Sequence, residues 1–210
     1  MAEVDFLHEA GAARAAVLRD GMYCLRHRVF KERLGWNVTS VEGREQDKYD
    51  DLRPVYLLCR NELDEVEGCW RLMPTAGPYL LKDVFGELLY GHPAPQDPET
   101  WEISRFAIQP RQKNYGSLAA VHEITGRMFG RLFEFGLEHG IVRIVGVTDV
   151  LCERLLTRAG VFIERFGPPK KIGRTLAVAG WLDVTQENLD RVRAYCAVPP
   201  DEPCSKPSQR

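Results

Sequence analysis

The 210-residue sequence has little net charge, no paired cysteine motif and no long apolar run, and each absence excludes a class of protein. The formal net charge is −2 and the pI about 6.2, so no overall field attracts nucleic acid or a membrane surface. Six cysteines form no CxxC pair and are scattered through core-like segments, which indicates reduced thiols and neither a disulfide framework nor a zinc site. No apolar segment approaches the length that crosses a membrane.

Targeting and nucleotide-binding motifs are also missing. The amino-terminal segment MAEVDFLHEA has neither a basic start nor an apolar run, so no signal peptide is expected. Neither GxGxxG nor GxxxxGK followed by Ser or Thr occurs, which removes support for a dinucleotide or P-loop site. The basic segment PPKKIGR is too short to indicate DNA binding. We therefore expect a cytoplasmic protein that contacts neither nucleic acid nor a membrane.

What the sequence does contain is a mixture of helical and extended segments. Hydrophobic side chains make up 44% of the chain, enough for one core that buries roughly 70% of the unfolded surface. Apolar periodicity predicts helices over 13–34, 79–89, 118–135 and 149–159 and from about 185, with Thr148 capping the fourth. Short apolar segments predict strands over 55–59, 66–74, 101–108, 141–147, 161–166 and 175–184.

This order of elements predicts an α/β fold, a single-domain, three-layer sandwich in which helices cover a twisted mixed sheet. In this interpretation the domain occupies residues 1–197, and the segment 198–210, VPPDEPCSKPSQR, is a disordered tail. The acidic segment 37–51, NVTSVEGREQDKYDD, has no sustained periodicity and is expected to be a loop.

Charged residues interrupt two of the expected strands. An isolated ionised side chain costs several kcal/mol to bury, so Glu102 and Arg105 in WEISRFAI require partners or a polar ligand. Arg71 interrupts the apolar segment CWRLM in the same way. The acidic segment offers nearby carboxylates, namely Glu45, Asp47, Asp50 and Asp51.

These charges have two interpretations. Either they form separate surface or edge ion pairs, which contribute little to stability, or they form a shared network, a costly arrangement that is usual at functional sites. In the second case arginine forks suit a substrate carboxylate, and carboxylates suit an ammonium or sulfonium. Phe30 and Trp36, beside the acidic segment, either present aromatic faces to a cation or simply pack in the core.

Glu102 is the candidate general base, because burial in an apolar strand raises the pKa of a carboxyl toward neutrality. The competing interpretation is a structural salt bridge from Glu102 to Arg71 or to Arg26. Arg26 lies on the first predicted helix, one turn before Phe30, so both side chains face the same way.

Five separated segments carry a family resemblance: LRHRVFKERLGW, EQDKYDD, GCWRLMPT, YLLKDVF and WEISRFA. In order and spacing they resemble the bacterial acyl-homoserine-lactone synthases, the Lux-type autoinducer synthases of quorum sensing, across about residues 20–183. The resemblance implies a fold similar to that of GCN5-type N-acetyltransferases. The family's functional residues match Arg26, Phe30, Trp36, Glu45, Asp47, Asp50, Arg71, Phe85, Glu102 and Arg105.

The resemblance also implies a reaction with two substrates and no cofactor or metal. An acyl chain would pass from acyl carrier protein to the amine of S-adenosylmethionine, with Glu102 accepting the proton through water. Lactone closure would then release methylthioadenosine and yield a quorum-sensing signal. The expected substrate-binding residues are Arg26, Phe30, Trp36, Asp47, Ser104, Arg105, Phe106, Gly146 and Thr148, and the expected structural ion network is Glu45, Asp50 and Arg71.

Two further expectations concern the acyl donor. Family members with 3-oxo products tend to carry a threonine two positions before the match of Thr148, whereas Gly146 here offers no side-chain donor. This indicates an unsubstituted chain of about octanoyl size, unless Gly146 only relieves close strand packing. The carrier protein is expected to dock on the helix 149–159 through Arg154 and Arg158, extended by Lys170, unless these residues form an ordinary solvated face.

Two other functions compete with this interpretation. A CoA-dependent N-acyltransferase of the same fold holds the CoA pyrophosphate in a glycine-rich loop before a helix, but the corresponding segment RQKNYGSLA contains only Gly116. A non-catalytic module that binds S-adenosylmethionine predicts loss of the base, whereas Glu102 is present. The sequence leaves the acyl chain length and the oligomeric state open.

Overall fold

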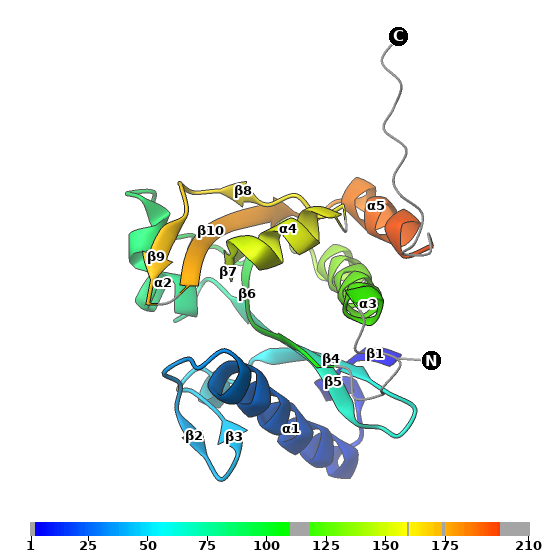
Figure 1. The fold of residues 1–210 in the computed structure, drawn as a ribbon. Coiled ribbons are helices and arrows are strands. Elements are labelled where there is room, and N and C mark those ends of the chain that lie inside the picture. The colour runs from blue at the N-terminus through cyan, green and yellow to red at the C-terminus, as the bar shows by residue number, and fades with distance from the viewer. Residues whose placement is uncertain (1–2, 110–117, 159, 174, 198–210) are drawn as a thin grey trace.

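The computed structural model describes residues 3–109, 118–158, 160–173 and 175–197 (Figure 1). The expected tail at 198–210 and most of the segment RQKNYGSLA lie outside these residues. The predicted α/β class is confirmed, since helices cover both faces of one large mixed sheet. Among the described helices, none combines the length and the apolar character needed to cross a membrane.

In the described part of the chain, eight strands form the main sheet in the order β1-β4-β5-β6-β7-β10-β8, with β9 paired to β10. Their bounds are β1 Glu3–Phe6, β4 Val55–Arg60, β5 Val66–Pro74, β6 Thr100–Ile108, β7 Arg143–Asp149, β8 Glu164–Arg165, β9 Lys170–Ile172 and β10 Thr175–Asp183. A separate hairpin of β2 Ser40–Val41 and β3 Arg44–Glu45 lies within the acidic segment.

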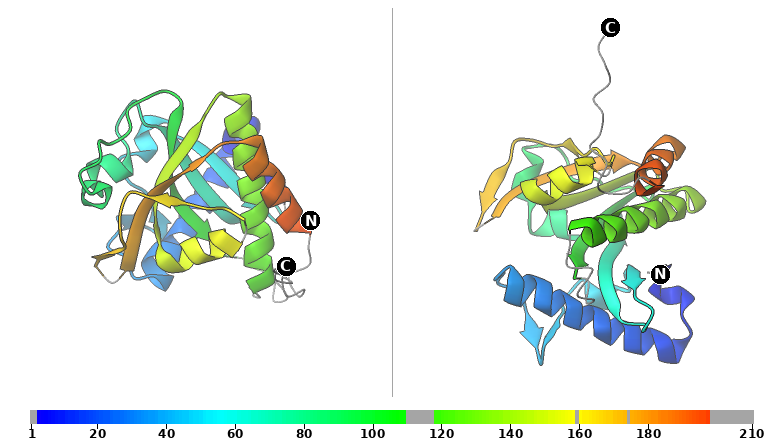
Figure 2. Two further views of the ribbon diagram at one scale, coloured as in Figure 1. Left: turned by 90° about the horizontal axis from the view of Figure 1, so that it is seen from above. Right: turned by 45° about the vertical axis from the view of Figure 1, so that its right-hand side comes forward.

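The helices divide between the two faces of the sheet (Figure 1). One face carries α1 (Ala12–Arg26) with its π-helical continuation η2 (His27–Arg33), and farther along it α2 (Leu80–Asp83) and η4 (Gly86–Leu89). The other face carries α3 (Leu118–Glu138), α4 (Val150–Arg158) and α5 (Gln186–Ala197), and Figure 2 shows α3 and α5 side by side. Short turns of 3-10 helix occupy η1 (Leu7–Glu9) and η3 (Asp50–Leu52).

Alternating strand side chains supply a core on each face of the sheet. Trp70 of β5 packs against Phe129 of α3, with ring centroids 4.5 Å apart. Its neighbour Cys69 belongs to the opposite cluster, with Met22 and Leu25 of α1. The sheet is therefore covered on both faces where β5 passes between α1 and α3.

The sheet opens between β6 and β7. These two strands are parallel and pair from Thr100 with Arg143 to Ile103 with Gly146. Beyond Ile103, β6 continues with β5 and β7 continues with β10, so the two strands diverge (Figure 1). One edge of β6 after Ile103 is consequently free of a neighbouring strand.

A β-bulge interrupts β6 just beyond this divergence. Ser104 opposes Arg71 and Ala107 opposes Cys69, so two residues of β6, Arg105 and its successor, share the single partner between them on β5. Arg105 has a φ of 57°, in the left-handed region that side chains with a Cβ rarely adopt. The bulge turns Arg105 to the α1 face, although regular alternation would point it to the α3 face.

Several predicted elements differ from the structure. The predicted helix 79–89 splits into α2 and η4, and only Glu164–Arg165 of the predicted strand 161–166 pairs with the sheet. The predicted cap Thr148 is wrong, because β7 extends to Asp149. Oδ1 of Asp149 accepts the N–H groups of Leu151 (2.8 Å) and Cys152 (2.7 Å), as a cap does.

Strands β1, β2, β3 and β9 were not predicted. They have only two to four residues each, too few to show an alternating pattern. The expectation of reduced thiols is confirmed for the five cysteines that the structure describes, all of which are free.

Candidate functional site

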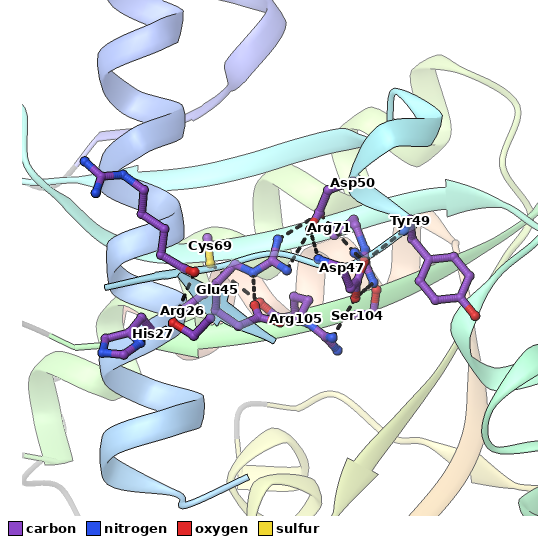
Figure 3. A network of polar contacts seen from close by, with 12 residues as sticks. Arg26, His27, Glu45, Asp47, Tyr49, Asp50, Cys69, Arg71, Ser104 and Arg105 are labelled. Carbon is purple, nitrogen blue, oxygen red and sulfur yellow. Dashed lines mark hydrogen bonds and ion pairs between the residues drawn. The ribbon is translucent and has the colours of Figure 1, made fainter. Parts of the chain in front are cut away.

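Arg26, the last residue of α1, pairs with two carboxylates of the acidic segment (Figure 3). Its Nε donates to Oε2 of Glu45 (2.5 Å), and its terminal nitrogens donate to both oxygens of Asp50 (2.8 and 2.9 Å). Arg71 on β5 donates from Nη1 to the same Asp50 (3.0 Å). Asp50 therefore ties the helix to the sheet.

Arg105 and Asp47 close these ion pairs into a ring. Arg71 donates to both oxygens of Asp47 (2.5 and 3.1 Å), and Nη2 of Arg105 donates to Oδ2 of Asp47 (2.6 Å). Nε of Arg105 then donates to Oε1 of Glu45 (3.2 Å). We call this set the ionic ring: Arg26, Glu45, Asp47, Asp50, Arg71 and Arg105.

The ionic ring is deeply buried on the side of Arg26 and Arg71, whose side chains are 0% exposed. Burial alone lowers the pKa of Arg26, but Asp50 and Glu45 outweigh it and raise that pKa above its usual range. Burial alone raises the pKa of Asp50, and Arg26 and Arg71 hold it well below its usual range. Three cations balance three carboxylates, so the charges form one buried network and not separate surface pairs.

The ring has one accessible side, where Arg105 and Asp47 keep 12% and 17% of their side-chain surface exposed. The guanidinium of Arg105 lies over the ring of Phe30 at 5.7 Å, and Phe30 stacks on Trp36 with centroids 5.1 Å apart. Trp36 is 37% exposed. Four of the expected substrate-binding residues thus lie together, whereas Arg26 lies inside the ring with all its charge paired.

Two tyrosines that the sequence did not indicate complete the network. The hydroxyl of Tyr56 donates to Oδ1 of Asp50 (2.6 Å), and the ring of Tyr49 lies 5.3 Å from the guanidinium carbon of Arg71. The backbone N–H of Asp47 donates to Asp50, and that of Tyr49 donates to Asp47, so the acidic turn is fixed by its own side chains. Tyr56 opposes Arg71 in the β4–β5 ladder. The sequence could have indicated this contact only if the register of the two strands were known.

Glu102 lies on the same face of β6 as the ring but outside it. The residue is 1% exposed, and its carboxylate accepts the backbone N–H groups of Leu80 (3.0 Å) and Leu81 (2.5 Å) at the start of α2. The expected alternative, a salt bridge to Arg26 or Arg71, is not made, because both arginines use the ring carboxylates. Burial raises the pKa of Glu102 to about 7, although the two N–H groups act against the rise.

An apolar pocket of about 520 Å³, its open mouth included, lies where β6 and β7 diverge. It is lined on the α3 and α4 side by Phe129, Cys152 and Leu156, and Arg105 of the ionic ring is also among its lining residues. Ser104, Arg105 and Phe106 of β6 and Gly146 and Thr148 of β7 line it, so five expected substrate-binding residues meet here. The rest of the lining is mainly aromatic and aliphatic, including Trp70, Phe129, Ile144, Leu156 and Leu182.

Two residues of the pocket wall have further contacts. The Oγ of Ser104 accepts from Nε of Arg71 (3.1 Å), which joins the pocket wall to the ionic ring through β6. A Cβ on Gly146 would lie 2.9 Å from the carbonyl oxygen of Ile103. Close packing of β6 and β7 therefore favours glycine at this position, whatever the acyl chain.

The three expected docking residues lie on two elements, α4 and β9. Arg154 and Arg158 are both exposed on α4, the helix that contributes Cys152 and Leu156 to the pocket. Lys170 instead lies on β9, where its ammonium pairs with Glu87 of η4. Both side chains of this pair are about half exposed, so docking through Arg154, Arg158 and Lys170 stays a prediction.

Two solved structures show which class of proteins shares this fold. A protein described as an N-acetyltransferase from Lactobacillus plantarum matches over 88% of this chain and 99% of its own at a TM-score of 0.56 and 14% identity, which shows the fold alone. BjaI, a CoA-dependent acyl-homoserine-lactone synthase solved with S-adenosylmethionine and isopentyl-CoA, matches at a TM-score of 0.81 and 24% identity over 95% of this chain and 91% of its own. The chain has the fold of these acyltransferases, as the sequence predicted.

More similar proteins define the family. The autoinducer synthase profile matches residues 12–192. The acyl-homoserine-lactone synthase of Pseudomonas aeruginosa is 45% identical over 160 residues, which cover 75% of this chain and 78% of the relative. The crystal structure of the synthase LasI superimposes at a TM-score of 0.80 with 38% identity, over 92% of this chain and 94% of that one. This chain belongs to the autoinducer synthase family. It is an acyltransferase, an acyl-homoserine-lactone synthase.

Proposed function

We propose that the enzyme transfers an acyl group from acyl carrier protein to the amine of S-adenosylmethionine and then closes the lactone. One observation carries the proposal: the ionic ring and the apolar pocket adjoin on strand β6, where Arg105 of the ring lines the pocket and Ser104 of the pocket wall bonds to Arg71. Charged groups suit a zwitterionic amino acid, and an apolar pocket suits an acyl chain. The S-adenosylmethionine and isopentyl-CoA bound to BjaI support two substrates of this kind.

In the first step, the substrate nitrogen attacks the thioester carbonyl, so a C–N bond forms, the C–S bond breaks and the carrier thiol leaves. The ammonium must first lose a proton, and a carboxyl with a pKa of about 7 is well matched to that task. We assign it to Glu102, acting through a water molecule. We assign stabilisation of the oxyanion to backbone N–H groups of β6 beyond Ser104, on the edge that β7 does not cover.

In the second step, a carboxylate oxygen of the acylated intermediate attacks the γ-carbon beside the sulfonium. A C–O bond forms, the C–S bond breaks, and neutral methylthioadenosine leaves. This step mainly requires the substrate to be held in a folded conformation. Arg105 and Asp47, the accessible members of the ionic ring, are assigned to the substrate's carboxylate and cationic groups, with Phe30 and Trp36 beside them.

The acyl donor is assigned to carrier protein because exposed Arg154 and Arg158 lie on the helix that walls the acyl pocket, where an acidic partner would dock. Acyl-CoA is the second candidate, favoured by the CoA dependence of BjaI. The glycine-poor segment that argued against CoA lies mostly outside the described residues. The proposed chemistry uses no cofactor.

The test is a reaction of purified enzyme with S-adenosylmethionine and either octanoyl carrier protein or octanoyl-CoA, with products measured by mass spectrometry. We expect octanoyl-homoserine lactone and methylthioadenosine, with the higher kcat/KM for the carrier protein. A higher kcat/KM for octanoyl-CoA would overturn the donor assignment. Acylated S-adenosylmethionine that accumulates without lactone would overturn the second step.

A further inference from the structure

The carboxyl end of β6 carries an arginine that the ionic ring does not use. Arg33, the last residue of η2, is exposed and donates from Nη1 to the carbonyl oxygen of Ile108 (3.1 Å). Desolvation lowers its pKa, and no carboxylate among the described residues acts against that shift. A cation whose hydrogen bond among the described residues goes to a carbonyl oxygen retains capacity for an anion.

The guanidinium of Arg33 lies on the free edge of β6. Ile108 opposes Gly68 in the β5–β6 ladder, and the N–H of Gln109 donates to the carbonyl oxygen of Glu67 (2.8 Å). This pattern makes Ile108 and Gly68 a pair without mutual hydrogen bonds, so the carbonyl of Ile108 points away from β5. The carbonyl of Ile108 therefore points to the edge of β6 that β7 does not cover, and Arg33 donates its hydrogen bond on that side.

The distance along this edge matches the arm that carries the acyl group. Ile103, which lines the pocket, and Ile108 oppose Leu72 and Gly68, four residues apart on β5, so a strand rise of about 3.3 Å per residue puts them about 13 Å apart. An extended pantetheine arm spans on the order of 15 Å from thioester sulfur to phosphorus, from about a dozen bonds of roughly 1.3–1.5 Å. Its two amides can pair with a free strand edge, as an added strand does.

We propose that Arg33 binds the phosphate of the phosphopantetheine arm, which lies along the free edge of β6 with its thioester at the pocket mouth. The inference rests on the proposed acyl transfer and adds a specific contact to it. Arg28, on the same helix, donates from Nε to the side-chain oxygen of Gln109 (3.3 Å) and adds positive charge at this end of the strand. The phosphate is common to carrier protein and CoA.

The test compares the wild-type enzyme with Arg33→Gln on octanoyl carrier protein, octanoyl-CoA and octanoyl-pantetheine, which lacks the phosphate. We expect KM to rise about tenfold for both phosphate-bearing donors, with kcat and the KM for S-adenosylmethionine unchanged. Octanoyl-pantetheine should react equally well with both enzymes. Arg33→Lys should recover part of the loss, because it keeps the charge without the fork.

Lys31→Gln is the matched control, because Lys31 is exposed on the same helix and two residues away, so it faces another direction. An equal loss on all three donors, or no change in KM, would overturn the proposal. A response confined to octanoyl-CoA would assign Arg33 to the nucleotide, and one confined to carrier protein would assign it to protein docking; either overturns the phosphate contact. Wild-type enzyme that forms no lactone from any donor would refute the proposed function instead.

Discussion

The two faces of β6 hold their residues in different ways. On the α1 face, each arginine of the ionic ring is paired with two carboxylates, and each carboxylate with two arginines. On the α3 face, apolar side chains bound a pocket that contains few directional contacts. Charge-assisted hydrogen bonds fix distances and angles, whereas apolar packing fixes mainly shape and volume. We therefore expect the enzyme to be strict about the charged substrate and more tolerant of the acyl chain.

The largest predicted effect comes from opening the ring. Arg71→Ala removes a fully buried partner from Asp47 and Asp50, which keep only Arg105 and Arg26 respectively, so we expect a loss of roughly 3–5 kcal/mol in the free energy of unfolding. Arg143→Ala is the control, because its pair with Asp183 is nearly half exposed on both sides and contributes at most about 1 kcal/mol. Urea denaturation measures both. Equal losses in the two variants would show that the ring is no stronger than a surface pair.

Replacing Glu102, the candidate base, should lower kcat and leave the affinity for S-adenosylmethionine unchanged. Glu102→Gln keeps the size of the side chain but cannot accept a proton, so we expect kcat to fall about 10²-fold or more. Binding of S-adenosylmethionine, measured by calorimetry, should be close to that of the wild type, because Arg105 and Asp47 are untouched. Near wild-type turnover would remove Glu102 from the mechanism.

Glu102 and the ring should also respond to pH with opposite signs. The pKa of Glu102 is raised by burial to about 7, so its contribution to stability is present below its unfolded value and is lost as pH rises through about 7. The pKa of Asp50 is lowered, mainly by Arg26 against the effect of burial, so its contribution is lost only as pH falls into the acid range. Between about pH 4.5 and 7 the change therefore belongs to Glu102.

In that window, the stability of Glu102→Gln relative to the wild type should increase with pH by at most about 3 kcal/mol. Urea denaturation at a series of pH values gives the difference directly. Parallel curves for the two proteins would mean that the carboxyl of Glu102 titrates alike in the folded and unfolded states.

The sequence indicated the members of the ring because charges inside apolar strands are conspicuous. It did not indicate how Arg105 reaches the ring. Glu102 and Arg105 lie three residues apart, and in a regular strand they would face opposite sides of the sheet. The bulge at Arg105 puts Glu102 and Arg105 on the same face of the sheet. The segment WEISRFAI contains no glycine that would have indicated a residue in the left-handed region. Similarly, the partners of Glu102 are backbone N–H groups, which every residue carries and no motif marks.

The overall class of fold was readable from periodicity, but the features that shape the pocket were not. The divergence of β6 from β7 depends on strand pairing between segments about 40 residues apart. The helix cap is Asp149, one residue after the predicted Thr148, because β7 continues beyond its apolar residues. These are tertiary effects, and they decide which side chains of β7 line the pocket.

The apolar face should show a smaller effect, in the choice of acyl chain. Gly146 offers no side-chain donor in the pocket wall, so a 3-oxo oxygen buried there would be disfavoured by about 1–3 kcal/mol. We expect octanoyl carrier protein to outcompete 3-oxo-octanoyl carrier protein on the unmutated enzyme. Preference for the 3-oxo donor would overturn this. Gly146→Thr is a poor test by itself, because its Cβ would press on the carbonyl of Ile103.

The smallest effect should come from the surface of α4, which belongs to neither face of β6. Arg154 and Arg158 are exposed, and cations there attract an acidic carrier protein through solvent, where salt screens the attraction. Reversing both to Glu should raise the KM for acyl carrier protein severalfold at low salt and less at high salt, with kcat unchanged. Octanoyl-pantetheine serves as the control donor, because it has no protein surface to dock. If the KM of the variant does not depend on ionic strength, the docking surface lies elsewhere. If the KM for octanoyl-pantetheine rises as much as that for carrier protein, the substitutions distort the pocket wall that α4 supplies.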